Sequence, residues 1–262
     1  MKEQCTAKLH DLTGKKHIIF VSRGNAAIKL ALKYVKAQGK TTLLFQDQGG
    51  WITYGQFADR LKLDPAKLKT DHGLVSPDLL RNHNDSALII NSMPAYAFLQ
   101  DMNLISKACK NQNIFLINDV SGSIGTPEAK FGDLILGSFG ASKPIEVGSG
   151  GFIATDSKEV SEFIETEQTR LDFKKLNQAL DHLKQRLDTY KKARSGILKD
   201  LSKYDILNPH SSGINVIIKY NSEEEKEDIE KYCKTHNFKY TLCPRYIRVL
   251  EKAVSIEIKQ LR

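Results

Sequence analysis

The chain has 262 residues, of which 40% are hydrophobic and 27% charged, with a formal net charge of +8. This composition is typical of a globular protein with one large domain, or with a large and a small one. No apolar run is long enough to span a membrane and residues 1–16 contain no apolar segment of the signal-peptide kind, so we expect a cytoplasmic protein without a membrane partner.

The cysteines and the basic residues give no sign of a metal or nucleic-acid site. The four cysteines are scattered, and none has metal-ligand spacing with another cysteine or with the seven histidines, so we expect reduced thiols and no metal. The positive charge would suit an anionic partner, but the basic residues of segment 174–194 alternate with acids. We therefore favour a solvated basic face over a nucleic-acid surface.

From residue 17 to about residue 155, apolar strand-like runs alternate with helical patterns, which indicates an α/β fold with parallel strands. The runs have few polar residues, as expected for strands that are covered on both faces. Strands are predicted at 17–22, 41–47, 86–92, 113–119, 131–139 and 151–155. Helices are predicted at 25–39, with Ala26, Leu30 and Tyr34 near one face, and at 97–112.

From residue 158 the pattern becomes helical, and a small α+β unit follows. Helices are predicted at 158–171 and then to about residue 204, with an apolar packing face at Leu176, Leu180, Leu183, Leu187, Tyr190, Ile197 and Leu201. A strand at 214–220, a helix opened by a capping box from Ser222 to Glu225 and a final segment at 238–261 follow. We therefore expect an arm (1–16), a large domain (17–157), a helical linker (158–204) and a small domain (205–262).

Three features lie at the carboxyl ends of predicted strands, where open α/β sheets bind ligands. The stretch SRGNAAI (22–28) runs from a strand through a glycine into a helix, a natural phosphate site that also occurs without a ligand. Asp119 ends a strand and could pair with a cationic ligand atom or cap a turn. Lys143 follows Ser138 by five residues and could form a Schiff base, although most lysines are solvated.

Taken in chain order, these motifs resemble the large domain of the fold-type I pyridoxal-phosphate enzymes. The closest resemblance is to the DegT/DnrJ/EryC1/StrS sugar aminotransferase family, over about residues 17–156. SRGNAAI matches the S-G-T-A-A-L segment, QDQGGWITY places Trp51 at the position of a ring-stacking aromatic, and NDVSGSIG matches E-D-x-x-Q/H-x-x-G. SFGASK followed by GSGGFIAT matches S-F-x-x-x-K with the glycine pair and strand after it.

The resemblance implies a role for each matching residue. Lys143 is similar to the lysine that carries the cofactor as an internal aldimine, and Asp119 to the aspartate that pairs with the pyridine nitrogen. Trp51 would stack on the ring, and Gly24, Asn25 and Ser138 would hold the phosphate. It further implies a fold-type I large domain with a sheet of the mostly parallel, seven-stranded type, a small C-terminal α+β domain and a homodimer.

In the small domain, the resemblance points to Arg248 as the residue for a substrate carboxylate, with Arg245 as an alternative. Three positions differ from the family pattern. Gly122 stands where Gln or His is usual, Asn25 replaces a threonine, and Pro144 follows the lysine in place of Asn.

Three hypotheses remain open at this stage. The first is a pyridoxal-phosphate-dependent aminotransferase that acts on a small amino donor and a carbonyl acceptor. The second is another reaction of the same cofactor, by a lyase, a decarboxylase or a desulfurase, the last with Cys243 as a possible sulfur carrier. The third is a binding or regulatory protein that keeps the fold without catalysis, which Gly122 and the short small domain favour.

Overall fold

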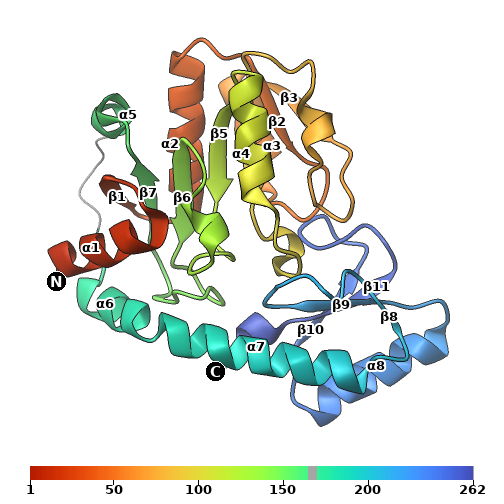
Figure 1. The fold of residues 1–262 in the computed structure, drawn as a ribbon. Helices are drawn as coiled ribbons and strands as arrows, with labels where there is room; N and C mark the ends of the chain where they lie inside the picture. The colour runs from red at the N-terminus through yellow and green to blue at the C-terminus, as the bar shows by residue number, and fades with distance from the viewer. Residues whose placement is uncertain (165–169, 262) are drawn as a thin grey trace.

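The computed structural model describes residues 1–164 and 170–261, and its larger part is built on a seven-stranded sheet (Figure 1). The strand order is β1-β7-β6-β5-β4-β2-β3. The strands are β1 (His17–Val21), β2 (Thr42–Gln46), β3 (Asp64–Leu68), β4 (Ala87–Asn91), β5 (Phe115–Asp119), β6 (Leu134–Ser138) and β7 (Gly151–Thr155). All neighbours pair in parallel except β7, which is antiparallel to β1 and β6. The expected mostly parallel sheet is confirmed.

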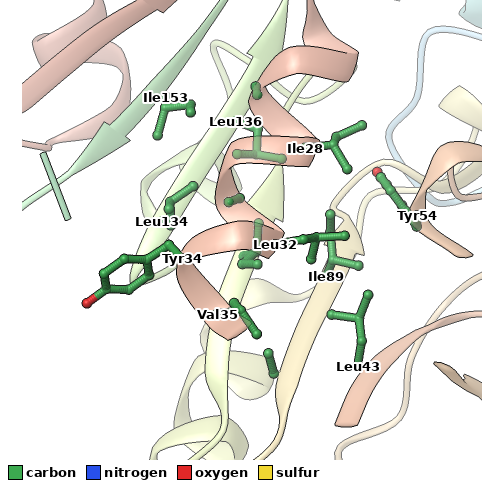
Figure 2. Packing of buried hydrophobic residues seen from close by; sticks show 14 of the residues in the cluster. Ile28, Leu32, Tyr34, Val35, Leu43, Tyr54, Ile89, Leu134, Leu136 and Ile153 are labelled. Atoms are coloured by element: carbon green, nitrogen blue, oxygen red, sulfur yellow. The ribbon is translucent and has the colours of Figure 1, made fainter. Parts of the chain in front are cut away.

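Helices cover both faces of this sheet because its central strands are apolar on both sides. They are α1 (Lys2–Thr13), α2 (Gly24–Ala37), α3 (Thr53–Leu61), α4 (Met102–Asn111), α5 (Lys158–Phe163) and α6 (Phe173–Asp181). Figure 2 shows the face covered by α2, where Ile28, Leu32 and Val35 point toward the sheet. Ala26 and Leu30 of the predicted face are only half-buried, so the buried face of α2 is shifted relative to the prediction.

The smaller part contains a four-stranded antiparallel sheet with order β10-β11-β9-β8. Its elements are α7 (Leu183–Asp200), β8 (Asp205–Ile206), β9 (Val216–Lys219), α8 (Glu223–Thr235), β10 (Tyr240–Cys243) and β11 (Ala253–Ile256). Ser222 Oγ accepts from the Glu225 backbone N–H over 3.2 Å, as the capping box predicts. Figure 1 shows α7 running beneath the large sheet to the small one.

The segment between β4 and α4 leaves the large domain and packs into the core of the small one. Met93 and Tyr96 lie in an apolar cluster with α7, β9 and β11, and Phe98 lies in a second cluster with β9 and β11. The predicted helix at 97–112 therefore begins too early, since α4 starts at Met102, where the Asp101 side chain caps it. The described residues also form four short 3-10 helices: η1 (Pro77–Leu80), η2 (Pro94–Tyr96), η3 (Pro127–Lys130) and η4 (Ile258–Gln260).

Four further elements differ from the sequence prediction or go beyond it. The predicted helix at 158–171 is α5 up to Phe163, and its residues 165–169 lie outside the described residues. The arm contains α1, whose Cys5 and Leu9 pack in one cluster with Leu176 of α6. Helix α3 and the edge strand β3 were not predicted, because β3 (DPAKL) is mostly exposed and has no continuous apolar run.

Candidate active site

The carboxyl ends of β1, β4, β5 and β6 border a cavity of ≈ 280 Å³. The cavity is lined by Arg23, Gly24, Asn25, Ile28, Gly50, Trp51, Asn91, Tyr96, Asp119, Ser121, Leu136, Gly137, Ser138, Gly140, Ala141, Lys143 and Ile247. The structure thus brings together the six residues for which the sequence predicted a role toward the cofactor. Arg248, the predicted substrate residue, is not part of this lining.

Asp119 ends β5 and presents a buried carboxylate to the cavity, with an exposed fraction of 7%. Its Oδ2 accepts a hydrogen bond from Tyr54 Oη over 2.6 Å, and its Oδ1 accepts from the Ser121 backbone N–H over 3.0 Å. Burial and the neighbouring Asp119 raise the pKa of Tyr54 well above its ordinary value, so Tyr54 stays a donor. These two hydrogen bonds hold the carboxylate in one orientation.

The first turn of α2 forms the part of the cavity that suits an anion. Arg23 occupies the N-cap position and makes no side-chain cap bond, and the first N–H groups of any helix lack an intrahelical acceptor. A Cβ at Gly24 would lie 2.9 Å from Ser138 Cβ, so the glycine permits the helix to approach the end of β6. Ser138 Oγ accepts from the Gly140 backbone N–H over 3.2 Å.

Trp51 lies between β2 and α3 and is held by α2. Its Nε1–H donates to Asn25 Oδ1 over 2.8 Å, and the Thr53 hydroxyl donates to the same oxygen over 3.4 Å. The amide oxygen of Asn25, the residue that replaces threonine in the family pattern, thus orients the indole ring. The Lys143 Nζ lies 5.5 Å from the centroid of that ring.

Lys143 is carried by a turn between β6 and β7, which we call the lysine turn (residues 139–148). The preceding Ser142 has φ of 57°, and the following Pro144 is buried. The Lys143 carbonyl accepts from Arg186 Nη1 over 3.3 Å. The lysine turn therefore contacts α7, and the side chain of Lys143 extends into the cavity.

Tyr96 is the residue of this site that sequence reasoning missed. Its hydroxyl is hydrogen-bonded to Lys143 Nζ. A Cβ at Gly122 would lie 2.8 Å from Tyr96 Cδ1, so the position where the family pattern has Gln or His has no room for a side chain. Ala95 and Tyr96 have φ of 56° and 60°, a left-handed backbone that costs roughly 1 kcal/mol or more per residue. No residue pattern in PAYAF indicates this placement.

Arg248 is buried in a cluster of charges beside the cavity. Its Nε and Nη2 donate to the two carboxylate oxygens of Glu257, each over 2.7 Å, and its Nη1 donates to the Ile247 carbonyl over 2.8 Å. Lys259 Nζ lies 3.2 Å from Glu257 Oε2. The alternative residue, Arg245, is exposed and outside the cavity lining.

Opposing effects set the pKa values in this cluster. Burial alone would raise the pKa of Glu257, but Arg248 and Lys259 outweigh it, and the net shift is downward. For Lys259, burial lowers the pKa to about 8, against the opposing effect of Glu257. The predicted role of Arg248 toward a substrate carboxylate stays a prediction, and it would require the pair with Glu257 to open.

The described residues show little else that suggests metal or thiol chemistry. Within residues 1–164 and 170–261, no three His, Cys, Asp or Glu side chains form a group that could hold a metal ion. The four cysteines are free and buried, and burial raises the pKa of Cys243. In the same two segments, no helix is both long and apolar enough to cross a membrane.

Two protein-family models match this chain. The model of the DegT/DnrJ/EryC1/StrS aminotransferase family matches residues 2–178, and that of the MJ1341 family C-terminal domain matches residues 170–262. Comparison with curated protein sequences gives no match.

Solved structures share the fold over almost the whole chain. A DegT DnrJ EryC1 StrS aminotransferase from Brucella abortus is 14% identical with a TM-score of 0.75, over 98% of this chain and 84% of that one. Helicobacter pylori PseC, an aminotransferase involved in pseudoaminic acid biosynthesis, is 14% identical with a TM-score of 0.73, over 97% and 85%. The E. coli GDP-4-keto-6-deoxy-D-mannose-3-dehydratase with bound hydrated PLP is 14% identical with a TM-score of 0.74, over 100% and 89%.

The likeness to these structures concerns the fold, since the identities are low. The family model, in contrast, matches more than half of the chain, including every residue that we predicted to contact the cofactor. The chain therefore belongs to the DegT/DnrJ/EryC1/StrS aminotransferase family.

Proposed function

We propose that this protein is a pyridoxal 5'-phosphate-dependent aminotransferase, which moves an amino group from a small-molecule donor to a carbonyl acceptor. The observation that carries the proposal is the shared cavity of Lys143, Asp119 and the first turn of α2. These residues supply an amine, a carboxylate and an anion site, the three groups that an aldehyde, a pyridine nitrogen and a phosphate require. Membership of the aminotransferase family supports the same proposal.

When bound, pyridoxal phosphate supplies an electron-withdrawing ring that stabilises negative charge on the carbon next to the amino nitrogen. Asp119 would hold the ring nitrogen in its protonated form, and its two hydrogen bonds keep the carboxylate in place. Lys143 supplies the amine for attachment and afterwards holds and moves a proton at Nζ. Trp51, oriented by Asn25, restrains the ring against rotation.

The phosphate would lie at the first turn of α2, against the backbone N–H groups of Gly24 and Asn25 and the hydroxyl of Ser138. Ser121 Oγ accepts a hydrogen bond from the Ser138 backbone N–H at the end of β6, over 3.1 Å. This bond keeps the loop after β5 next to the loop after β6, so the carboxylate and the anion site stay at a fixed separation.

Trp51 is the only tryptophan of the chain, so its fluorescence reports this cavity alone. We expect added pyridoxal phosphate to quench that fluorescence and to give a visible absorption band. Borohydride should then fix the cofactor on the peptide that contains Lys143. Lys143→Ala should abolish the fixation and Lys130→Ala, at an exposed lysine of η3, should not. A wild-type protein without band or fixation would rule the proposal out.

A different reaction of the same cofactor is the alternative function. One similar solved structure is a dehydratase, which keeps this alternative open. Incubation of the loaded protein with a panel of amino acids separates the possibilities. Release of a keto acid with conversion of the cofactor to its amine form supports transamination, whereas release of an amine or of sulfide supports decarboxylation or desulfuration. Cofactor binding with no reaction on any donor would favour a binding or regulatory role.

We also propose that the protein is a homodimer, on the basis of the family resemblance, and that it is cytoplasmic, on the basis of its sequence. Sedimentation of the loaded protein tests the oligomeric state. Activity that rises with protein concentration in parallel with dimer formation would indicate that the site is complete only in the dimer.

A further inference from the structure

We propose that Tyr96 is a positioning residue for Lys143, which it holds from the side of the small domain. The proposal rests on the proposed function where it concerns the cofactor. It starts from one contact, the hydrogen bond between Tyr96 Oη and Lys143 Nζ. The Lys143 Nζ also lies 4.5 Å from the centroid of the Tyr96 ring, so both the hydroxyl and the ring face the ammonium group.

Tyr96 is itself fixed by both parts of the molecule. Its carbonyl accepts from the Ile214 backbone N–H over 2.8 Å, and the carbonyl of Ala95 accepts from Asn215 Nδ2 over 3.3 Å. On the other side, the Ala95 backbone N–H donates to the Gly49 carbonyl over 3.0 Å. These contacts hold the left-handed backbone at residues 95 and 96 and leave the ring 6% exposed.

The environment of the ring explains why the phenol points toward Lys143. Arg248 Cζ and Lys259 Nζ lie 5.4 and 4.9 Å from its centroid, so two further cations surround the ring. Gly122 leaves the space that the ring fills. The Tyr96 hydroxyl oxygen accepts a hydrogen bond from Lys143 Nζ, and this contact restricts Lys143 to one of its many rotamers. An amine restricted in this way needs less reorientation to react.

Tyr96→Phe removes the hydroxyl and keeps the ring. Tyr246→Phe is the matched control, because the Tyr246 hydroxyl donates to the Gln46 carbonyl over 3.1 Å and Tyr246 is outside the cavity lining. Acetylation by succinimidyl acetate needs no fixed orientation of the amine, so in cofactor-free protein the loss of the hydrogen bond to Tyr96 should make Lys143 more accessible to it. Limited treatment should acetylate Lys143 about threefold more in Tyr96→Phe, relative to Lys130 in the same sample. The control should match the wild type. Equal acetylation of Lys143 in Tyr96→Phe and wild type would overturn the proposal.

With pyridoxal phosphate present, the rate of attachment should fall about tenfold in Tyr96→Phe, measured by the visible absorption band. In a Lys143→Ala background, the same substitution should change the Kd for the cofactor less than threefold, measured by Trp51 fluorescence, because the partner of the hydroxyl is gone. A change above threefold there would show direct contact with the cofactor and would overturn the positioning role. If the wild type attaches no cofactor, the proposed function fails, while the acetylation result still decides the role of Tyr96.

Discussion

Arg248 and Glu257 form a buried two-point ion pair at the base of the small sheet, with both N–O distances at 2.7 Å. Removal of one partner leaves a buried charge unpaired, so Glu257→Gln should lower the free energy of unfolding by about 3–5 kcal/mol. Urea unfolding of the cofactor-free protein measures this. The triple variant Arg248→Met, Glu257→Leu and Lys259→Met leaves no charge of the cluster unpaired; it is the control and should be less destabilised than Glu257→Gln. A single variant as stable as the wild type would contradict the prediction.

The same carboxylate predicts an acid dependence of stability. Because the net pKa of Glu257 is lowered in the folded state, its contribution is fully present above its unfolded pKa, near 4.5. The contribution is lost as the pH falls through the folded pKa. The stability difference between wild type and Glu257→Gln should therefore shrink below about pH 4.5. Urea midpoints measured from pH 3 to pH 7 test this, and a difference that stays constant would refute it.

Lys259 should make the free energy of unfolding depend on pH in the alkaline range. Its folded pKa of about 8 lies below the ordinary lysine value of 10.5, so between these pH values the unfolded chain binds more protons than the folded one. The free energy of unfolding should rise by about 1–3 kcal/mol over that window, relative to the isosteric Lys259→Met. Urea titrations at pH 7.5 and pH 10.5 measure the difference. An equal change in the free energy of unfolding for the wild type and Lys259→Met would contradict a lowered pKa of Lys259.

Gly122 and Tyr96 should be coupled sterically. Gly122 lacks a left-handed φ, so Gly122→Ala acts through the contact of the new methyl group with the Tyr96 ring and should cost about 1–3 kcal/mol. In a Tyr96→Ala background the ring is gone, and the same substitution should cost much less. A double-mutant cycle from thermal or urea unfolding gives the coupling energy. Equal costs in both backgrounds would show that the destabilisation does not come from contact with the Tyr96 ring.

The cysteines should be inert in the folded protein. Burial raises the pKa of all four thiols, to about 12 for Cys109 and Cys233. Ellman's reagent should therefore react with none of them within minutes in native buffer and with all four in denaturant. Rapid reaction of Cys243 in the native protein would instead revive its role as a sulfur carrier.

The parallel strands of the large sheet could be predicted because burial on both faces makes them nearly continuous apolar runs. Strand β3 could not, since it lies at the edge of the sheet and its sequence DPAKL is mostly exposed. Helix α3 follows Trp51 closely and has only three buried residues, so its apolar pattern is weak.

The residues of the candidate site likewise include some that the sequence predicts and some that it does not. Asp119 and Ser138 end strands and Lys143 lies in the turn that follows β6, so the order of these residues along the chain was enough to predict that they share one site. Tyr96 depends on the packing of segment 93–99 into the small domain, which is a tertiary relationship. The pair of Arg248 and Glu257 likewise crosses a turn and a strand, so the sequence predicted the arginine without its partner.

Helix α7 contacts the backbone beside the candidate site at two points. Arg186 donates to the Lys143 carbonyl in the lysine turn, and one turn later the Tyr190 hydroxyl donates to the Lys259 carbonyl in the small domain over 3.2 Å. An 18-residue helix is too stiff to change length between these two points. A rotation of the small domain that moved α7 would therefore displace the backbone of Lys143 as well, so the placement of this amine is mechanically linked to the position of the small domain.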